Sequence, residues 1–249
     1  MKTVLPIIFN LFLCLYPSQG WAYLDELDSL LKAHVTPVEA NDIKYNGVDY
    51  DHWSMDLNHA KVRKEIQKVK LETLKTKEQK MAFWINAYNF FIVDLLIQKG
   101  ERDGITDLSG VKTAWDRYIW SVDGDTYTLN DIKDKQLKPF NDPRVYFALA
   151  CAGKSCPDLR MEAYRAEDIE EQLDDQVKKL LQNKTKGFDL VKGEINTVRV
   201  NEIFKWEEKE FNKGNVKSWL LRYFPLVINA ATKIKYYDFD WSLNSQPRD

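Results

Sequence analysis

TKEQKMAFWINAYNFFIVDLLIQKG, residues 76–100, predicts a long helix with two marked ends. Thr76 with Gln79 three positions later is the pattern of a capping box, and Gly100 stands where helices commonly end in left-handed backbone. Between these ends, residues 81–97 are apolar on nearly every face, which is typical of a helix surrounded by protein core. The few polar residues inside this stretch argue against a membrane span.

Amphipathic helices and strand pairs are expected around this central helix. Apolar residues recur at helical spacing over residues 24–31, 56–71 and 167–183. Asp123-Gly124 and Lys192-Gly193 each separate two short apolar runs, which predicts two hairpins. The sequence therefore predicts an α+β fold: a single domain with a mostly antiparallel sheet, a buried central helix at about residues 76–99 and several amphipathic helices.

Local signals predict the remaining elements. Residues 145–150 could form a helix opened by Asp142-Pro143 or a buried strand, and we expect a strand because a glycine-containing loop follows directly. The other expected elements are an extended turn over residues 48–53, a helix capped by Asn130 and ending near Leu137, a helix capped by Asn215 and ending at Pro225, and a strand over residues 234–241.

The N-terminus has the pattern of a secretory signal. A positive start at Lys2 precedes an apolar run over residues 4–16, too short for a stable membrane span, and small residues stand before a cleavage point after Ala22. We expect an exported protein, periplasmic or secreted, with no membrane anchor after cleavage. The expected organisation is a signal peptide at 1–22, a helical segment at 23–47, a globular domain at 48–244 and a tail at 245–249.

Charge and motifs exclude several classes of function. The formal net charge is −2, which leaves no basic footprint for nucleic acid. No P-loop, dinucleotide-type glycine motif or Gly-x-Ser-x-Gly elbow is present, so we expect neither nucleotide chemistry nor serine hydrolysis, and no cofactor. A possible metal cluster does not follow any standard ligand spacing, so no metal is expected; its members are His52, His59, Asp49, Asp51 and Asp56.

Chemistry is most concentrated around Cys151 and Cys156, in the segment Cys-Ala-Gly-Lys-Ser-Cys. Pro157 favours the first position of a helix, which would place Cys156 at its N-cap, where backbone N–H groups and Lys154 favour a nucleophilic thiolate. Two other interpretations stay open. The cysteines could form a structural disulfide in an oxidising compartment, or they could be inert buried thiols.

A thiol enzyme usually needs a histidine base, and all three histidines precede Cys156. His52 or His59 would then serve in reversed chain order, although each lies in polar sequence typical of an exposed surface. Asn86 and Asn89 are three apart on the central helix and share one face. Their amides must find partners, either by holding neighbouring backbone or by lining a pocket.

Five motifs are recognisable along the chain: Ala82-Phe-Trp-Ile-Asn-Ala-Tyr-Asn89, Asp142-Pro-Arg-Val-Tyr-Phe-Ala-Leu149, Ser155-Cys-Pro-Asp-Leu159, Ile203-Phe-Lys-Trp206 with Phe211, and Asp240-Trp-Ser-Leu-Asn244. Together they resemble the DUF547 family, a domain of unknown function. The resemblance spans about residues 48–244 and implies that a histidine usually stands where this chain has Tyr146. Tyrosine, with an ordinary pKa of about 10, is a poor general base near neutrality.

Two functions remain as hypotheses, each with an unknown small molecule or peptide as partner. The first is a thiol-dependent hydrolase or transferase centred on Cys156, with Ser155 and the following amides stabilising the thiolate; Asn86, Asn89 and Tyr146 complete its expected site. The second is a non-catalytic binding or scaffold domain with a Cys151–Cys156 disulfide and an aromatic recognition surface. Thiol–disulfide exchange is less favoured, because Cys-x-x-x-x-Cys is wider than the usual redox pair.

Overall fold

Helix α4 (Lys77–Lys99) lies at the centre of the fold, as predicted. The structure is a computed structural model that describes residues 23–110 and 113–247, so the predicted signal peptide lies outside the described residues. The Thr76 side chain accepts the backbone N–H of Gln79, and the Gln79 side chain accepts the N–H of Thr76 in return. Gly100 ends the helix at φ 63°, so both predicted helix ends are confirmed.

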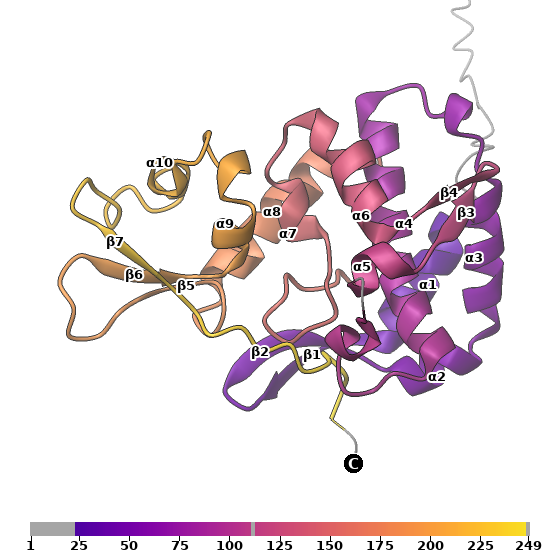
Figure 1. Ribbon diagram of the computed structural model, residues 1–249, viewed down its shortest axis with the longest axis horizontal. Helices are drawn as coiled ribbons and strands as arrows, with labels where there is room; N and C mark the ends of the chain where they lie inside the picture. Colours follow the sequence, from indigo (N-terminus) through magenta and orange to yellow (C-terminus); the bar gives the residue numbers. More distant parts are fainter. Residues whose placement is uncertain (1–22, 111–112, 248–249) are drawn as a thin grey trace, which may run out of the picture.

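Helices from distant parts of the chain surround α4 (Figure 1). The predicted amphipathic helices at residues 24–31, 56–71 and 167–183 are confirmed as α1, α3 and α8. The other α-helices of the described residues are α1 (Leu24–His34), α2 (Tyr50–Met55), α3 (Leu57–Lys68), α5 (Ala114–Arg117), α6 (Leu129–Asp131), α7 (Val145–Ala148) and α8 (Ile169–Gln182), with α9 (Ile203–Trp206) and α10 (Val216–Leu220) at the far end of the molecule.

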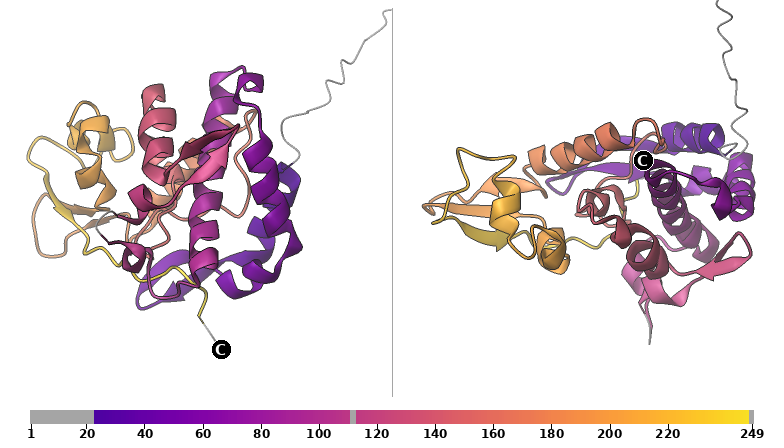
Figure 2. Two further views of the ribbon diagram at one scale, coloured as in Figure 1. Left: turned by 45° about the vertical axis from the view of Figure 1, so that its right-hand side comes forward. Right: turned by 90° about the horizontal axis from the view of Figure 1, so that it is seen from above.

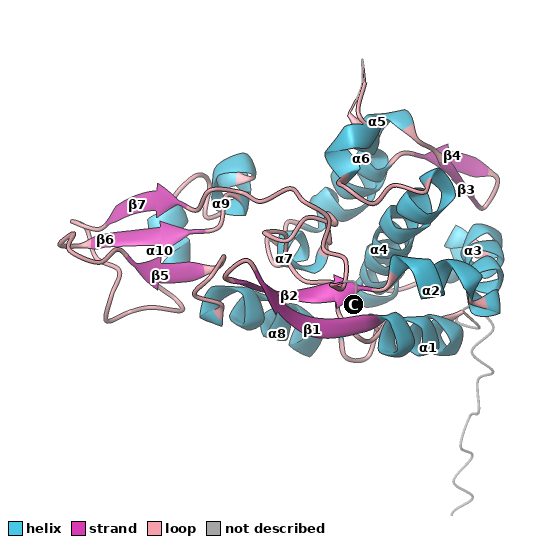
Figure 3. Ribbon diagram, turned by 90° about the horizontal axis from the view of Figure 1, so that it is seen from below, coloured by secondary structure: helices cyan, strands magenta, loops and turns pink. Residues whose placement is uncertain are grey.

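Within the described residues, the strands form three separate small sheets, which Figure 3 shows from below. Both predicted hairpins are present, and the α+β class is confirmed. The strands that were expected to form one mostly antiparallel sheet are divided among these three sheets, however. One pairing is parallel, because α9 and α10 separate β7 from β6 along the chain. The sheets are β1 (Val35–Ala40) with β2 (Ile43–Val48), β3 (Trp120–Val122) with β4 (Asp125–Tyr127), and β5 (Phe188–Leu190) with β6 (Thr197–Val200) and β7 (Lys233–Tyr236).

Two apolar cores meet at α7. The larger core surrounds α4 and includes Val145 and Ala148 of α7. The smaller core includes Tyr146 and Phe147 of the same helix, together with aromatic residues from the C-terminal part, such as Trp219, whose ring stacks on that of Phe147 at 5.4 Å. Figure 2 shows the β5–β7 end of the molecule extending away from the helical end. Helix α7 therefore lies at the boundary between the cores.

The predicted strand at residues 145–150 is wrong, because these residues begin as helix α7. Asp142 accepts the backbone N–H of Arg144 at 3.0 Å, which supports a helical turn after Pro143. All four residues of α7 are buried, since the two cores lie on its opposite sides. A short segment that is buried all round has no polar face, so its apolar pattern alone does not separate helix from strand.

Three other local predictions need correction. Residues 50–55 form helix α2 instead of an extended turn, because the Asp49 side chain accepts the N–H of His52 and caps it. The cap of α6 is Thr128, which forms a capping box with Asp131, and not Asn130. Asn215 does cap α10, as predicted, but the helix ends at Leu220 and not at Pro225.

One described helix, α4, is long and apolar enough to cross a membrane, and 89% of its most apolar window is buried inside the protein. This burial is typical of the core helix of a globular fold.

Asp94 of α4 is fully buried, and its carboxylate is the partner of several polar side chains in the larger core. Its carboxylate pairs with His59 at 2.8 Å and with Arg63, both on α3, and accepts the indole N–H of Trp120 at 2.9 Å. His59 is therefore buried, at 6% exposure, whereas its polar sequence surroundings predicted an exposed position. Burial raises the pKa of Asp94, but the hydrogen bonds from His59 and Trp120 and the charge of Arg63 outweigh it and hold the pKa below its ordinary value.

Candidate functional site

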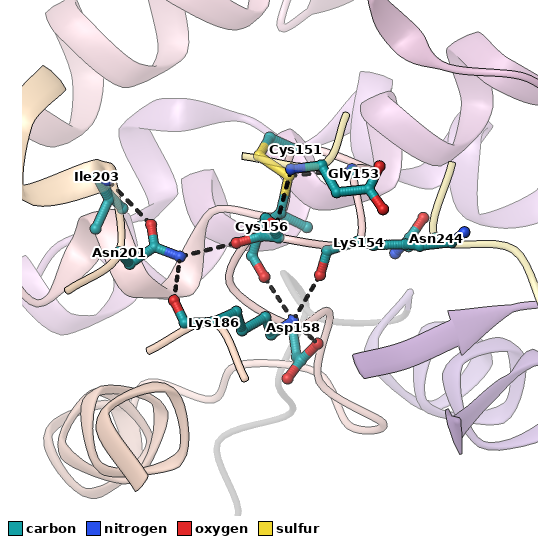
Figure 4. Close-up of a disulfide and its surroundings, with 12 residues drawn as sticks. Cys151, Gly153, Lys154, Cys156, Asp158, Lys186, Asn201, Ile203 and Asn244 are labelled. Atoms are coloured by element: carbon teal, nitrogen blue, oxygen red, sulfur yellow. Dashed lines mark hydrogen bonds and ion pairs between the residues drawn. A yellow bond between two sulfur atoms is a disulfide. The ribbon is translucent and has the colours of Figure 1, made fainter. Parts of the chain in front are cut away.

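Cys151 and Cys156 form a disulfide that closes a tight loop (Figure 4), with their Cα atoms 5.6 Å apart. Cys156 is 1% exposed, whereas Cys151 is half-buried. No helix begins at Pro157, so the predicted placement of Cys156 at a helix N-cap is wrong. Gly153 permits the close packing of this loop, because a Cβ there would lie 3.1 Å from the Asp240 carbonyl oxygen and 3.2 Å from Cys156 Sγ.

Lys186 anchors the disulfide loop from beneath. Its Nζ donates to the carbonyl oxygens of Lys154 at 3.0 Å and Cys156 at 2.8 Å, and to Asp158 Oδ1 at 2.7 Å, as Figure 4 shows. An ammonium group has three donors, and here each has one acceptor. The side chain is 1% exposed, and burial lowers the pKa of the Lys186 ammonium against the opposing pull of Asp158. Its paired acceptors therefore stabilise a charge that burial alone would disfavour.

Asn201 and the segment that follows β7, residues 237–247, also hold the disulfide loop in place. Asn201 Nδ2 donates to the carbonyl oxygens of Ser155 at 2.8 Å and Lys186 at 2.9 Å. The Ser155 hydroxyl oxygen accepts the N–H of Asp240 at 3.0 Å, and Ser155 N–H donates to the Asp240 carbonyl at 3.2 Å. The side chain predicted to stabilise a thiolate thus binds the tail that follows β7.

A pocket of about 290 Å³ opens where the two cores meet, close to the small end of the usual range for small-molecule sites. We call it the aromatic pocket. Its residues come from α4, α5, α6 and α7 and the turns beside them, from the disulfide loop, from α9 and from the segment that follows β7. They are Tyr88, Thr113, Trp115, Asn130, Lys133, Tyr146, Leu149, Cys151, Pro157, Ile203, Trp206, Glu207 and Trp241.

Tryptophan rings form much of the wall of the aromatic pocket. Trp206 and Trp241 stack with centroids 5.4 Å apart and an interplanar angle of 20°. Trp115 meets Trp241 edge-on at 5.9 Å, and its indole N–H donates to the Tyr88 hydroxyl at 3.1 Å. Trp206 is 45% exposed, so part of its ring surface is available to a ligand.

Two polar features stand among these rings. Lys133 and Glu207 form an ion pair at 2.9 Å. Tyr146 is 5% exposed, and its hydroxyl has no hydrogen-bond partner among the described residues. Burial raises the pKa of Tyr146 above its ordinary value, and the charges of Glu207 and Glu210 raise it further by a smaller amount. The phenol therefore stays neutral at physiological pH and is suited to donating a hydrogen bond rather than to accepting a proton.

The aromatic pocket contains Tyr146 and Cys151 but not the other predicted site residues. Asn86 accepts the N–H of Tyr164 and donates to its carbonyl, both at 2.8 Å. Asn89 holds the backbone of α7 in the same way, donating to the Ala148 carbonyl and accepting the N–H of the residue two positions on. These amides serve as backbone anchors here, and the catalytic roles assigned to Cys156, Ser155, Asn86, Asn89 and Tyr146 stay predictions.

The histidines lie in three separate pairs outside the aromatic pocket. His34 pairs with Asp56 at 3.1 Å, His52 with Asp49 at 2.6 Å, and His59 with Asp94 as described above. The histidine–aspartate set considered for a metal is thus divided, and neither candidate base lines the pocket that contains Cys151.

Residues 71–181 match the family model described as a protein of unknown function, DUF547. The chain carries a DUF547 domain. The match covers α4, α7, the disulfide loop and nearly all of α8, and it is shorter than the expected 48–244. Trp206 and Trp241 lie beyond it, so residues after the DUF547 match complete the aromatic pocket. No curated protein and no solved structure matched the chain.

Proposed function

We propose that this DUF547 protein is an exported binding domain that holds a small, ring-bearing ligand in the aromatic pocket. The disulfide is a fixed part of the pocket wall, which is the structural role that the non-catalytic hypothesis gives it. The observation that carries the proposal is a set of accessible tryptophan faces beside Tyr146, whose buried hydroxyl lacks a partner.

Ring stacking and hydrogen bonding would act together in this pocket. Indole faces favour planar rings, and a buried hydroxyl without a partner costs about 1–3 kcal/mol that a ligand acceptor can recover. The pocket lies where two cores meet, a common position for ligand sites. Lys186 and Asn201 fix the disulfide loop, so the wall is ordered before the ligand binds.

Export belongs to the same proposal. The signal pattern at residues 1–22 and the Cys151–Cys156 bridge are both typical of an oxidising compartment, periplasmic or extracellular.

The test uses dansylamide, a neutral fluorescent ring compound, with energy transfer from tryptophan as the signal. We expect saturable binding that weakens by about five-fold or more in Trp206→Ala, because the exposed ring face is lost. Leu226→Ala is the matched control, since Leu226 is 98% exposed and lines no part of the pocket. Absence of saturable binding, or equal weakening in both variants, would contradict the proposal.

A thiol-dependent hydrolase or transferase is the second candidate, because reduction would place the Cys151 thiol in the pocket wall. Cys156, the expected nucleophile, lies behind the wall and would need the loop to open. This candidate predicts that the reduced protein hydrolyses p-nitrophenyl acetate with saturation, and that Cys156→Ser abolishes the turnover. Under the binding proposal, the reduced protein shows no saturable esterase activity, either unaltered or as Cys156→Ser.

A further inference from the structure

A second pocket, of about 470 Å³, adjoins the aromatic pocket at Tyr146, and we call it the cationic pocket. Tyr146 lines both pockets. Residues of the cationic pocket that matter for charge are Lys138, Lys209, Lys213, Arg222, Asp142 and Glu210.

The same two segments form walls in both pockets. Residues 132–140 contribute Lys133 to the aromatic pocket and Lys138 to the cationic pocket. Residues 207–210 contribute Glu207 to the first and Glu210 to the second. An ion pair of 2.9 Å joins the two segments in each pocket, Lys133 with Glu207 and Lys138 with Glu210. The two pockets are thus consecutive along one pair of walls.

Charge distinguishes the second pocket from the first. Its two carboxylates are already paired, Asp142 with Arg144 and Glu210 with Lys138. Lys209 and Lys213 have no ion pair among the described residues, and Arg222 donates to a neutral amide oxygen of Asn212 at 2.8 Å. Three cations therefore remain without a carboxylate partner, which favours an anionic group at this end.

The region around the Tyr146 hydroxyl has the opposite preference. The charges of Glu207 and Glu210, from the two pockets, both act on this hydroxyl and raise its pKa. A ligand anion close to it would meet these carboxylates, whereas a neutral carbonyl or hydroxyl oxygen would accept its proton without repulsion.

We propose that the two pockets are the halves of one groove for an elongated acidic ligand. Its ring lies against the tryptophans, a neutral acceptor binds the Tyr146 hydroxyl, and its carboxylate or other acidic group lies against Lys209 and Lys213. The place of the ring rests on the proposed function; the acidic end is the new element.

The experiment compares dansyl-glycyl-glycine with its C-terminal amide, which has the same ring and carbonyls but no carboxylate. The intact protein should bind the acid about five-fold or more tightly than the amide. In Lys209→Glu/Lys213→Glu this preference should disappear while affinity for the amide stays within about two-fold. Lys178→Glu/Lys192→Glu is the control of equal charge change, since these exposed lysines line neither pocket, and it should keep the preference.

Tyr146→Phe tests the middle of the groove. It should weaken both dansyl-glycyl-glycine and its amide by about three-fold or more, the share of one hydrogen bond, and leave the preference for the acid over the amide unchanged. Equal affinities of acid and amide for the intact protein would overturn the groove, as would equal losses in the two lysine pairs. If dansylamide binds while these comparisons fail, the proposed function survives and only the acidic end is refuted.

Discussion

Replacing Lys186 with methionine should lower the free energy of unfolding by about 3–5 kcal/mol, the usual cost of breaking a buried charge pair. Methionine fills a similar volume but leaves the carbonyls of Lys154 and Cys156 and the carboxylate of Asp158 without their donor. Chemical denaturation followed by tryptophan fluorescence measures the change.

The control is Lys205→Met, because Lys205 forms an exposed ion pair with Glu202 at 3.2 Å. This pair should contribute less than about 1 kcal/mol. Similar changes in the two variants would mean that Lys186 does not anchor the disulfide loop.

Asp94→Ala should cost about 3–5 kcal/mol for a related reason. The variant leaves the Trp120 indole N–H and the buried ring of His59 without their acceptor, and it removes the counter-charge of Arg63. Glu65→Ala on α3 removes an exposed pair with Lys68 instead and should change stability by less than about 0.5 kcal/mol.

The pH dependence of the Asp94 effect follows from its lowered pKa. The unfolded carboxyl has a pKa of about 3.9, so the stabilisation is fully present above this value and is lost as the pH falls through the lower folded-state pKa. The stability difference between the unaltered protein and Asp94→Ala should therefore narrow below about pH 4. A difference that stays constant down to pH 2 would contradict the assigned network.

Sequence signals succeeded where a short pattern determines a local structure by itself. The capping box at Thr76 and Gln79 and the glycine end at Gly100 define α4, and Asp123-Gly124 marks the β3–β4 turn. They failed at α7, where both sides of a short segment are buried. They also failed at Pro157, because proline is common in turns and extended loops as well as at the start of a helix.

The candidate site was harder to predict because its residues are joined only by tertiary contacts. Lys186 is one of many lysines, and nothing near it in the sequence indicates burial; its role depends on Asp158, 28 residues earlier. Trp206 and Trp241 stood in the quoted motifs, but no spacing rule indicates that their rings stack. Of the alternatives left open for the cysteines, the Cys151–Cys156 disulfide is the one present, whereas the expected thiolate at Cys156 rested on a helix that does not form.

The central claim, that a permanent disulfide forms part of the pocket wall, is tested most directly by peptide mapping without reduction. Trypsin cuts after Arg144, Lys154 and Arg160, which places the two cysteines on different peptides, 145–154 and 155–160. Protein purified from its export compartment and alkylated should yield these peptides joined through sulfur, and separately only after reduction. Recovery of both as separate, alkylated peptides before reduction would contradict the claim.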